Sequence, residues 1–137
     1  MKIHIYFLSA AIVALLDQTT KHLVRTFIEP FETIRVLPFL NIINIRNEGA
    51  AFGMFRVISV VAIIFVIYLI LRGNEDKPGL SLILGGAAGN LLDRIFFWSV
   101  IDFIDVFAGR FHWPAFNVAD SALTIGIVVM LIRSFSD

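Results

Sequence analysis

Two aspartates, Asp102 and Asp120, have the residue type and the placement needed for acid–base chemistry at a membrane surface. Each lies at an end of a long apolar segment, and both ends fall near the same membrane face. Two carboxylates held close together cannot both ionise cheaply, and a low dielectric raises that penalty. Such a pair shares a proton, so one carboxylate activates water while its partner protonates or polarises an amide. This arrangement predicts peptide hydrolysis by an aspartic pair.

Other polar residues of the apolar segments recur at helical spacing, which places them on shared helix faces. They form three groups: Asp17, Thr20 and Lys21; Asn90, Asp93 and Arg94; and Asn117, Asp120, Ser121 and Thr124. One interpretation gives these groups a chemical role, because charged residues in membrane spans are costly. The other is that Asp–Lys and Asp–Arg bridges within each helix hold a bundle together. For the charged members of the first two groups, the structural interpretation has at least equal support.

Alternatives to the aspartic pair stay open at this stage. Asp102 or Asp105 could cap a turn at the interface, and for Asp105 we favour this structural role. A Ser121–Lys21 dyad is chemically possible, although nothing in the sequence joins the two residues. The three histidines lack metal-ligand spacing and the chain has no cysteine, which disfavours a zinc protease and excludes a thiol nucleophile. We expect neither a metal nor a cofactor.

The composition indicates a membrane protein. The chain has 137 residues, of which 58% are hydrophobic and 16% charged, and its mean hydropathy is +0.88. A soluble domain averages about 45–50% apolar and about 25% charged residues. Lys and Arg balance Asp and Glu at 11 each, so no basic surface points to nucleic acid. We expect one integral membrane domain over residues 1–137.

Four apolar segments position the polar residues, and we expect each to be a transmembrane helix. Their approximate bounds are 3–23, 55–72, 79–98 and 115–133. A span needs about 20 residues, and arginines at both ends of the second segment can snorkel to lengthen it. No convincing small-x-small cleavage site follows the first segment, so we expect a retained helix rather than a signal peptide. The spacing of Gly85 and Gly89 predicts a helix-packing face.

Residues 24–55 have a different pattern, in which charges alternate with apolar and β-branched residues. We expect short strands around Phe31–Val36 and Leu40–Arg46, with turns at Pro30 and Pro38. We expect residues 99–114 to be a linking stretch that lets neighbouring helix ends meet. The predicted fold class is thus an all-α integral membrane protein with four transmembrane helices and a small β-element, on the membrane surface, between helices 1 and 2.

The charge distribution alone favours the termini outside the cytoplasm. The side of the termini would carry Lys2, Arg72, Lys77 and Arg133, whereas the other would carry Lys21, Arg25, Arg35, Arg46, Arg56 and Arg110. Cytoplasmic loops usually hold the excess of Lys and Arg. Several of these arginines belong to the expected surface element rather than to a bare loop, so we give the count little weight.

Five motifs stand in order along the chain and together resemble those of lipoprotein signal peptidases, the type II signal peptidases of bacteria. They are Asp17–Lys21 (DQTTK), Asn47–Gly53 (NEGAAFG), Gly85–Arg94 (GGAAGNLLDR), Val100–Asp105 (VIDFID) and Phe116–Asp120 (FNVAD). The resemblance implies a four-helix aspartic endopeptidase of the inner membrane with both termini in the cytoplasm, which overrides the charge count. It also implies cleavage of prolipoproteins just before a diacylglyceryl-modified cysteine.

Matched by motif, the resemblance implies that Asp102 and Asp120 are the catalytic pair. Polar residues that line or support the site, or match further polar positions of the family, are Asn90, Arg94, Asn117, Asp17, Lys21 and Asn47. Residues 24–55 would be an extracytoplasmic β-cradle over the substrate. The implied partners are a lipid-modified prolipoprotein and membrane lipid, without nucleic acid; we expect a monomer with its site on the periplasmic or extracytoplasmic side. One departure is Phe97-Trp98-Ser99, where a glycine–aromatic pair is more usual.

Two non-enzymatic classes are the rivals: a small carrier or proton-relay subunit, and a structural assembly factor. The absence of repeat symmetry and the clustering of both acids at one face count against a carrier. Incubation of the purified protein with a lipid-modified prolipoprotein separates all three, because only a peptidase shortens the substrate.

Overall fold

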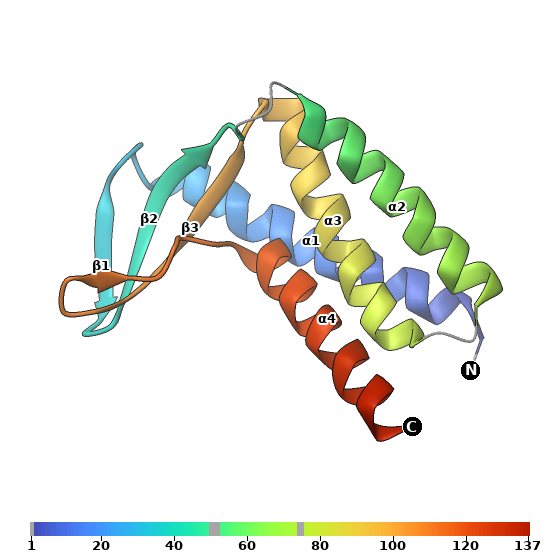
Figure 1. Ribbon diagram of the computed structural model, residues 1–137. Coiled ribbons are helices and arrows are strands. Elements are labelled where there is room, and N and C mark those ends of the chain that lie inside the picture. The colour runs from blue at the N-terminus through green and yellow to red at the C-terminus, as the bar shows by residue number, and fades with distance from the viewer. Residues whose placement is uncertain (1, 50–52, 74–75) are drawn as a thin grey trace.

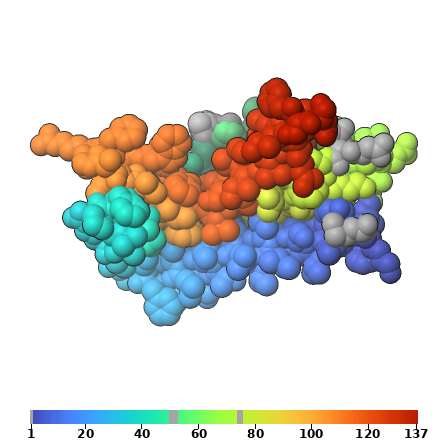
Figure 2. Space-filling view, turned by 90° about the horizontal axis from the view of Figure 1, so that it is seen from below, coloured from blue at the N-terminus to red at the C-terminus, as the bar shows by residue number. Residues whose placement is uncertain are grey.

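A computed structural model describes residues 2–49, 53–73 and 76–137 of the chain. In this part, four helices and four strands follow in the order α1, β1, β2, α2, α3, β3, β4, α4. The helices pack side by side, and the sheet lies at the end opposite to both termini (Figure 1). Figure 2 shows an elongated molecule, with the cyan β1 region and the orange β3 region together at one end.

The helices are α1 (His4–Phe27), α2 (Met54–Arg72), α3 (Lys77–Phe97) and α4 (Val118–Ser136). Within the described residues, α2, α3 and α4 are long and apolar enough to cross a membrane. Helix α1 carries charged side chains in its second half, including Asp17 and Lys21. The chain thus has an apolar helical body whose first helix becomes polar toward the sheet.

Several helix boundaries differ by a few residues from the predicted ones, and two of the differences lie next to the polar residues. Helix α1 continues to Phe27, so the first residues of the expected surface element are helical. Helix α4 begins at Val118 rather than near 115, because Asn117 is its N-cap. The Asn117 side chain accepts from the Asp120 backbone N–H, and the Asp120 carboxylate accepts from that of Asn117. This reciprocal capping box satisfies two N–H groups that a helix start leaves unpaired.

The strands are β1 (Thr33–Leu37), β2 (Leu40–Asn47), β3 (Val100–Ala108) and β4 (Phe111–His112). They form one antiparallel sheet in the order β1-β2-β3-β4. The predicted strands around 31–36 and 40–46 are confirmed with small shifts. The prediction that residues 99–114 only link two helices is wrong, because β3 and β4 make up half of the sheet.

The register of β2 and β3 brings the second half of the chain to the first. Ile45 lies opposite Asp102 and Asn41 opposite Asp105, with a bulge between Ile42 and Ile45. On the other side, Ile104 exchanges backbone hydrogen bonds with Phe116, just before the start of α4. Strand β3 therefore holds Asp102 between β2 and the N-terminus of α4.

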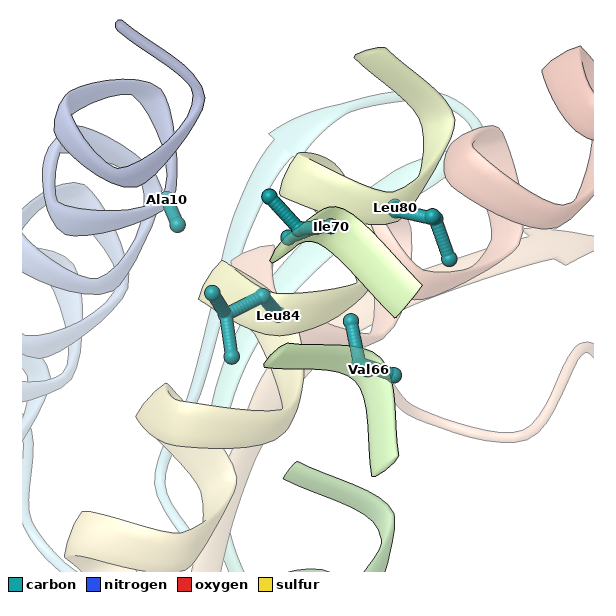
Figure 3. Packing of buried hydrophobic residues seen from close by; sticks show 5 residues of the cluster. All are labelled: Ala10, Val66, Ile70, Leu80 and Leu84. Carbon is teal, nitrogen blue, oxygen red and sulfur yellow. The ribbon is translucent and has the colours of Figure 1, made fainter. Parts of the chain in front are cut away.

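The apolar core of the helical body lies between α1, α2 and α3. Its buried members are Ala10, Val66, Ile70, Leu80 and Leu84 (Figure 3). Because lipid is as apolar as these side chains, close packing rather than escape from water holds such helices together.

Glycines on α3 allow its neighbours to approach the helix backbone. A Cβ added to Gly85 would lie 2.6 Å from the Ala10 carbonyl oxygen, and one added to Gly89 would collide with the Asp17 carboxylate. On another face, a Cβ on Gly86 would lie 2.5 Å from the Ala119 carbonyl oxygen. The predicted packing face is confirmed, and it sets α1 and α4 against α3 next to the polar residues.

Candidate active site

Asp102 lies in β3 at the junction of the sheet and the helices, and only 8% of its surface is exposed. Its Oδ1 accepts a hydrogen bond from the Asn117 side chain at 3.1 Å. Burial raises the pKa of Asp102 to about 6, and the nearby charge of Asp120 acts in the same direction. Opposing contributions from Asn47, Lys21 and Asn117 do not cancel these two effects. This carboxyl therefore takes up a proton more readily than an ordinary aspartate.

Asp120 occupies the first turn of α4 and is partly exposed. Its Oδ1 accepts from the Asn90 side chain at 2.9 Å, and its Oδ2 accepts from the Asn117 backbone N–H at 3.3 Å. Both partners are neutral amides rather than cations. Its carboxylate is thus oriented by hydrogen bonds on both oxygens.

Asn117 connects the two acids. Its side chain is fully buried and its Nδ2 lies within 3.2 Å of oxygens on Asp102, Asn90 and the Ile101 backbone. Its Oδ1 accepts from the Asp120 backbone N–H at 2.8 Å. One amide therefore contacts the carboxylate of Asp102 and the backbone of Asp120, which brings the two predicted acids to one place.

Lys21 lies beneath this arrangement and is fully buried. Its Nζ is 2.7 Å from an Asp17 oxygen, 3.3 Å from an Asp93 oxygen and 3.0 Å from the Asn90 Oδ1. A buried ammonium with this set of acceptors is compensated by two carboxylates. Through Asn90, the same lysine is also linked to Asp120. Lys21 thus joins the ion pairs below to the acids above.

Asp17 joins α1 to α4. The predicted ion pair with Lys21 is confirmed, and the second carboxylate oxygen accepts from the Ala119 backbone N–H at 2.9 Å. Ala119 lies in the first turn of α4, where N–H groups need acceptors from outside the helix. Asp17 therefore anchors the same helix end that carries Asp120.

The predicted Asp93–Arg94 bridge within α3 is wrong. Among the described residues, Asp93 instead meets cations of α1, with its oxygens 3.3 Å from Lys21 and 3.1 Å from Arg25. Neighbouring residues on a helix do not face each other. Arg94 donates to the Ser59 hydroxyl of α2 at 3.2 Å, and its guanidinium lies 5.6 Å from the centre of the Phe55 ring. Arg94 consequently connects α3 to α2 rather than joining the ion pairs.

Asn47 ends β2 opposite Val100 and is exposed. Its side-chain oxygen accepts from the Gly49 backbone N–H at 2.9 Å. Its amide also lies close enough to Asp102 to favour the ionised carboxylate there and thus to lower its pKa. The structure thus brings Asn47 to the acid pair, whereas Ala50, Ala51 and Phe52 of the same motif lie outside the described residues.

The prediction that Asp105 caps a turn is wrong. It is buried within β3, where its Oδ2 accepts from the Asn41 side chain at 3.0 Å and its Oδ1 lies 2.8 Å from His112 Nδ1. Burial by itself would raise the pKa of Asp105, but the hydrogen bonds from His112 and Asn41 hold it below its usual range. Asp105 is therefore a second polar centre, separate from the Asp102–Asp120 pair.

A hollow of about 570 Å³ adjoins Asp120. Its lining runs from the segment before α4 along one side of that helix: Trp113, Pro114, Ala115, Phe116, Asp120, Ser121, Thr124 and Ile125. The walls are mostly apolar, and Asp120 is the acid among them. One member of the pair is thus open to a bound molecule.

The described residues include no cluster of three or more His, Cys, Asp or Glu side chains arranged to hold a metal ion. Lys21 and Ser121 take different partners: Lys21 pairs with acids, whereas the Ser121 hydroxyl donates to the Asn117 carbonyl. The alternative Ser–Lys dyad therefore gains no support from the arrangement around the site.

The sequence did not lead us to two residues that bind Asp93, Gln18 and Arg25. Gln18 donates to an Asp93 oxygen and to the Gly89 carbonyl, both at 2.9 Å, and Arg25 reaches Asp93. Gln18 lies within the first motif, and Arg25 continues the four-residue spacing of Asp17 and Lys21. That spacing was available as a signal for Arg25.

Comparisons with known proteins show what this chain is similar to. Residues 9–136 match the sequence model of a family described as signal peptidase (SPase) II. The lipoprotein signal peptidase of Thermodesulfovibrio yellowstonii is 39% identical, over 98% of this chain and 97% of that protein. That of Geobacillus thermodenitrificans is 42% identical, over 96% of this chain and 89% of that protein.

The fold is also similar to solved structures. One, described as a bacterial membrane enzyme determined by the in meso method, is 34% identical and superimposes with a TM-score of 0.86. The similarity covers 98% of this chain and 89% of that chain. It therefore includes the helices and the sheet together.

Proposed function

Because the chain belongs to the signal peptidase II family, it removes signal peptides from prolipoproteins, and we propose that it does so as an aspartic endopeptidase. The proposed catalytic pair is Asp102 and Asp120. The observation that carries this assignment is the single buried amide of Asn117, which contacts both acids at the start of α4. The elevated pKa of Asp102 supports it, because a shared proton requires an acid that binds protons unusually well.

The proposed chemistry is the addition of one water molecule across a peptide bond. The ionised carboxylate takes a proton from the water as its oxygen attacks the carbonyl carbon, and the protonated partner polarises the carbonyl oxygen. Collapse of the tetrahedral intermediate breaks the C–N bond, and a proton passes to the leaving nitrogen. The products are a signal peptide with a new carboxyl group and a chain that begins with the diacylglyceryl-modified cysteine.

The remaining site residues have supporting roles in this proposal. Asn117 and Asn90 orient the two carboxylates, and Asn47, at the end of β2, favours the ionised form of Asp102. Asp17 and Lys21 hold α1 against α4 beneath the pair. Arg94 fixes α3 to α2 at the same end of the bundle. The assigned activity needs no cofactor.

We propose that all four helices cross the bilayer, α1 included. Large apolar side chains along the first half of α1 are exposed, such as Leu8 at 59% and Leu15 at 66%. Lipid would cover such a surface, as it would those of α2, α3 and α4. The charged half of α1 faces the buried network, which is where charged groups of membrane helices belong. The single proposed domain spans residues 1–137, with the β1–β2 hairpin and β3–β4 outside the membrane.

The proposed location is the bacterial inner membrane, with both termini in the cytoplasm and the acid pair on the extracytoplasmic side. The termini lie at one end of the bundle and the sheet at the other, which supports a site at the far membrane surface (Figure 1). A lipid-modified substrate reaches such a site from the bilayer while water enters from outside. The apolar hollow beside Asp120 fits the substrate next to the cleaved bond. We propose that a monomer suffices, because one chain supplies both acids.

The experiment that tests this function is the incubation of purified protein in detergent with a prolipoprotein, with and without diacylglyceryl modification. We expect cleavage of the modified form alone, with the lipidated cysteine as the new N-terminal residue by mass spectrometry. Absence of cleavage, or equal cleavage at other positions of both forms, contradicts the proposal.

A further inference from the structure

A second hollow, of about 430 Å³, lies on the sheet and does not include either acid of the catalytic pair. Its walls include Ile43 and Ile45 of β2, Asp105 of β3, His112 of β4 and the segment Trp113–Ala115. The lining is mixed, with apolar side chains beside a carboxylate and an imidazole. Binding sites have this general make-up, in which a few polar groups fix the orientation of a ligand held by apolar walls.

Asp105 organises the polar side of this hollow. Each of its carboxylate oxygens has a partner, Asn41 on one side and His112 on the other. Because both oxygens are engaged, Asp105 positions its neighbours rather than contacting a ligand itself. Burial alone would raise the pKa of Asp105, but these two hydrogen bonds lower it and so favour the ionised carboxylate.

His112 is the group that this arrangement presents. Its side chain is 49% exposed, and its ring stacks on Phe107 with 5.0 Å between the ring centres. The contact with Asp105 uses Nδ1, so Nε2 is the nitrogen that the exposed part of the ring can offer. A carboxylate on one ring nitrogen fixes the orientation of the other. His112 is thus a held hydrogen-bonding group at the edge of the hollow.

The two hollows share part of their lining. Trp113, Pro114 and Ala115 line both the hollow beside Asp120 and the hollow beside His112, so these three residues form a ridge between them. Backbone hydrogen bonds hold both sides of this ridge, from Trp113 N–H to the Val106 carbonyl and between Phe116 and Ile104. An extended chain that leaves Asp120 and crosses the ridge therefore arrives at His112.

We propose that the hollow beside His112 binds the first residues of the mature lipoprotein, the polypeptide that directly follows the lipid-modified cysteine. The inference rests on the proposed function and extends it to the other side of the cleaved bond. The signal peptide is apolar and belongs with the helices, whereas the mature chain is a water-soluble polypeptide that must leave over the sheet. Its backbone supplies the N–H and C=O groups that His112 recognises, with Asp105 as a positioning residue.

The test compares two diacylglyceryl-modified substrates that share one signal peptide. One continues for about ten residues after the cysteine, and the other ends with an amide directly after it. We expect His112→Ala and Asp105→Asn to raise KM for the long substrate by about five- to tenfold, the worth of one hydrogen bond, at little cost in kcat. Neither variant should change KM for the short substrate, and His112→Gln should recover part of the loss.

Arg110→Ala is the matched control, because Arg110 is exposed in the same β3–β4 turn but does not line the hollow. We expect it to leave both substrates unaffected. Equal losses on both substrates would assign His112 a structural role only and overturn the subsite. Unchanged KM for the long substrate in the His112→Ala variant would overturn it as well.

A measurement on the unaltered enzyme keeps the test decisive if a variant fails to fold. Lengthening the mature segment residue by residue should lower KM until the hollow is filled and then have no further effect. A KM independent of this length refutes the subsite while leaving the peptidase function intact. Failure to cleave any substrate of the series refutes the function and the subsite together.

Discussion

Four aspartates near the sheet end of the helices divide into two regions with different partners. Asp17 and Asp93 lie next to cations, with Lys21 between them and Arg25 beside Asp93. Asp102 and Asp120, close above, are instead held by the neutral amides of Asn117 and Asn90. We refer to the region of Asp17 and Asp93 as the lower region and to that of Asp102 and Asp120 as the upper region. The residue type is the same in both regions, but the compensation of charge differs.

The difference separates holding a structure from performing chemistry. A carboxylate paired with a buried lysine compensates the charge of that lysine, and loss of either partner leaves an uncompensated charge. A carboxylate held by amides keeps its position in either protonation state, because an amide both donates and accepts. The lower region thus fixes charge and geometry, while the upper region is free to exchange a proton.

The largest expected effect follows from preventing proton exchange at Asp102 or Asp120. Asp102→Asn and Asp120→Asn should each lower the cleavage rate by at least about 10²–10⁴-fold, roughly 3–5 kcal/mol of barrier, because asparagine cannot take a proton from water. Stability should hold or rise, since one of two like charges is removed. The measurement is the turnover of a diacylglyceryl-modified prolipoprotein alongside the melting temperature in detergent.

Asp137→Asn is the control for this pair of variants, because Asp137 is exposed at the opposite end of the molecule. It should cleave at the normal rate. Near-normal turnover by either Asp102→Asn or Asp120→Asn would refute the aspartic pair, and Ser121 with Lys21 would be tested next.

The lower region should respond in stability rather than in chemistry. Asp17→Ala removes the partner of Lys21 and the acceptor of the Ala119 N–H, so we expect a loss of about 3 kcal/mol in unfolding free energy. Thermal unfolding in detergent measures it. Thr19→Ala, on the exposed side of the same helix, should change stability by less than about 0.5 kcal/mol. Wild-type stability with lost activity would instead place Asp17 in the reaction.

The helices and the first hairpin could be predicted because they depend on local pattern. Apolar runs mark α2, α3 and α4, and Pro38 separates two alternating stretches that become β1 and β2. Strand β3 was not recognised, because Asp102 and Asp105 are three residues apart and break the two-residue alternation of a strand. Its pairing with β2 joins residues more than fifty positions apart, which no local pattern reveals.

The contacts of the site divide in the same way, into those that a local pattern predicts and those that it does not. Asp17 and Lys21 could be paired from their four-residue spacing on one helix. The partners of Asp93 could not, since Lys21 and Arg25 reach it from another helix. The role of Asn117 in contacting both acids depends on where α4 begins, and the sequence placed that start a few residues too early.

A smaller effect should appear in the pH dependence of stability. The folded-state pKa of Asp102 is raised to about 6, so the folded protein binds this proton more tightly than the unfolded chain. The resulting stabilisation is complete below about pH 4 and is lost as the pH rises through about 6. Relative to Asp102→Asn, the wild type should lose on the order of 1 kcal/mol between pH 4 and pH 7, after discount for solvent screening.

Melting temperatures of both proteins, measured side by side across this pH range, give the difference directly. The titrating groups other than Asp120, whose charge is coupled to that of Asp102, are common to the two proteins and cancel in the comparison. A constant difference would show that Asp102 has an ordinary acidity, and the distinction between the two regions would then lose its electrostatic basis.

The smallest expected effect concerns Arg94, which lies beside Asp93 in sequence but outside its ion pairs. Arg94→Ala removes a hydrogen bond to Ser59 and a contact with the Phe55 ring, while Asp93 keeps Lys21 and Arg25. Loss of these two contacts with uncharged partners should cost roughly 0.5–1 kcal/mol, well below the cost of Asp17→Ala. Arg94→Lys should fall between the wild type and alanine, because lysine keeps the charge but not the planar stacking group. Thermal unfolding of the wild type and the two Arg94 variants ranks their stabilities. If Arg94→Ala destabilises as much as Asp17→Ala, then Arg94 belongs to the charged region after all, and that region extends across α3 to α2.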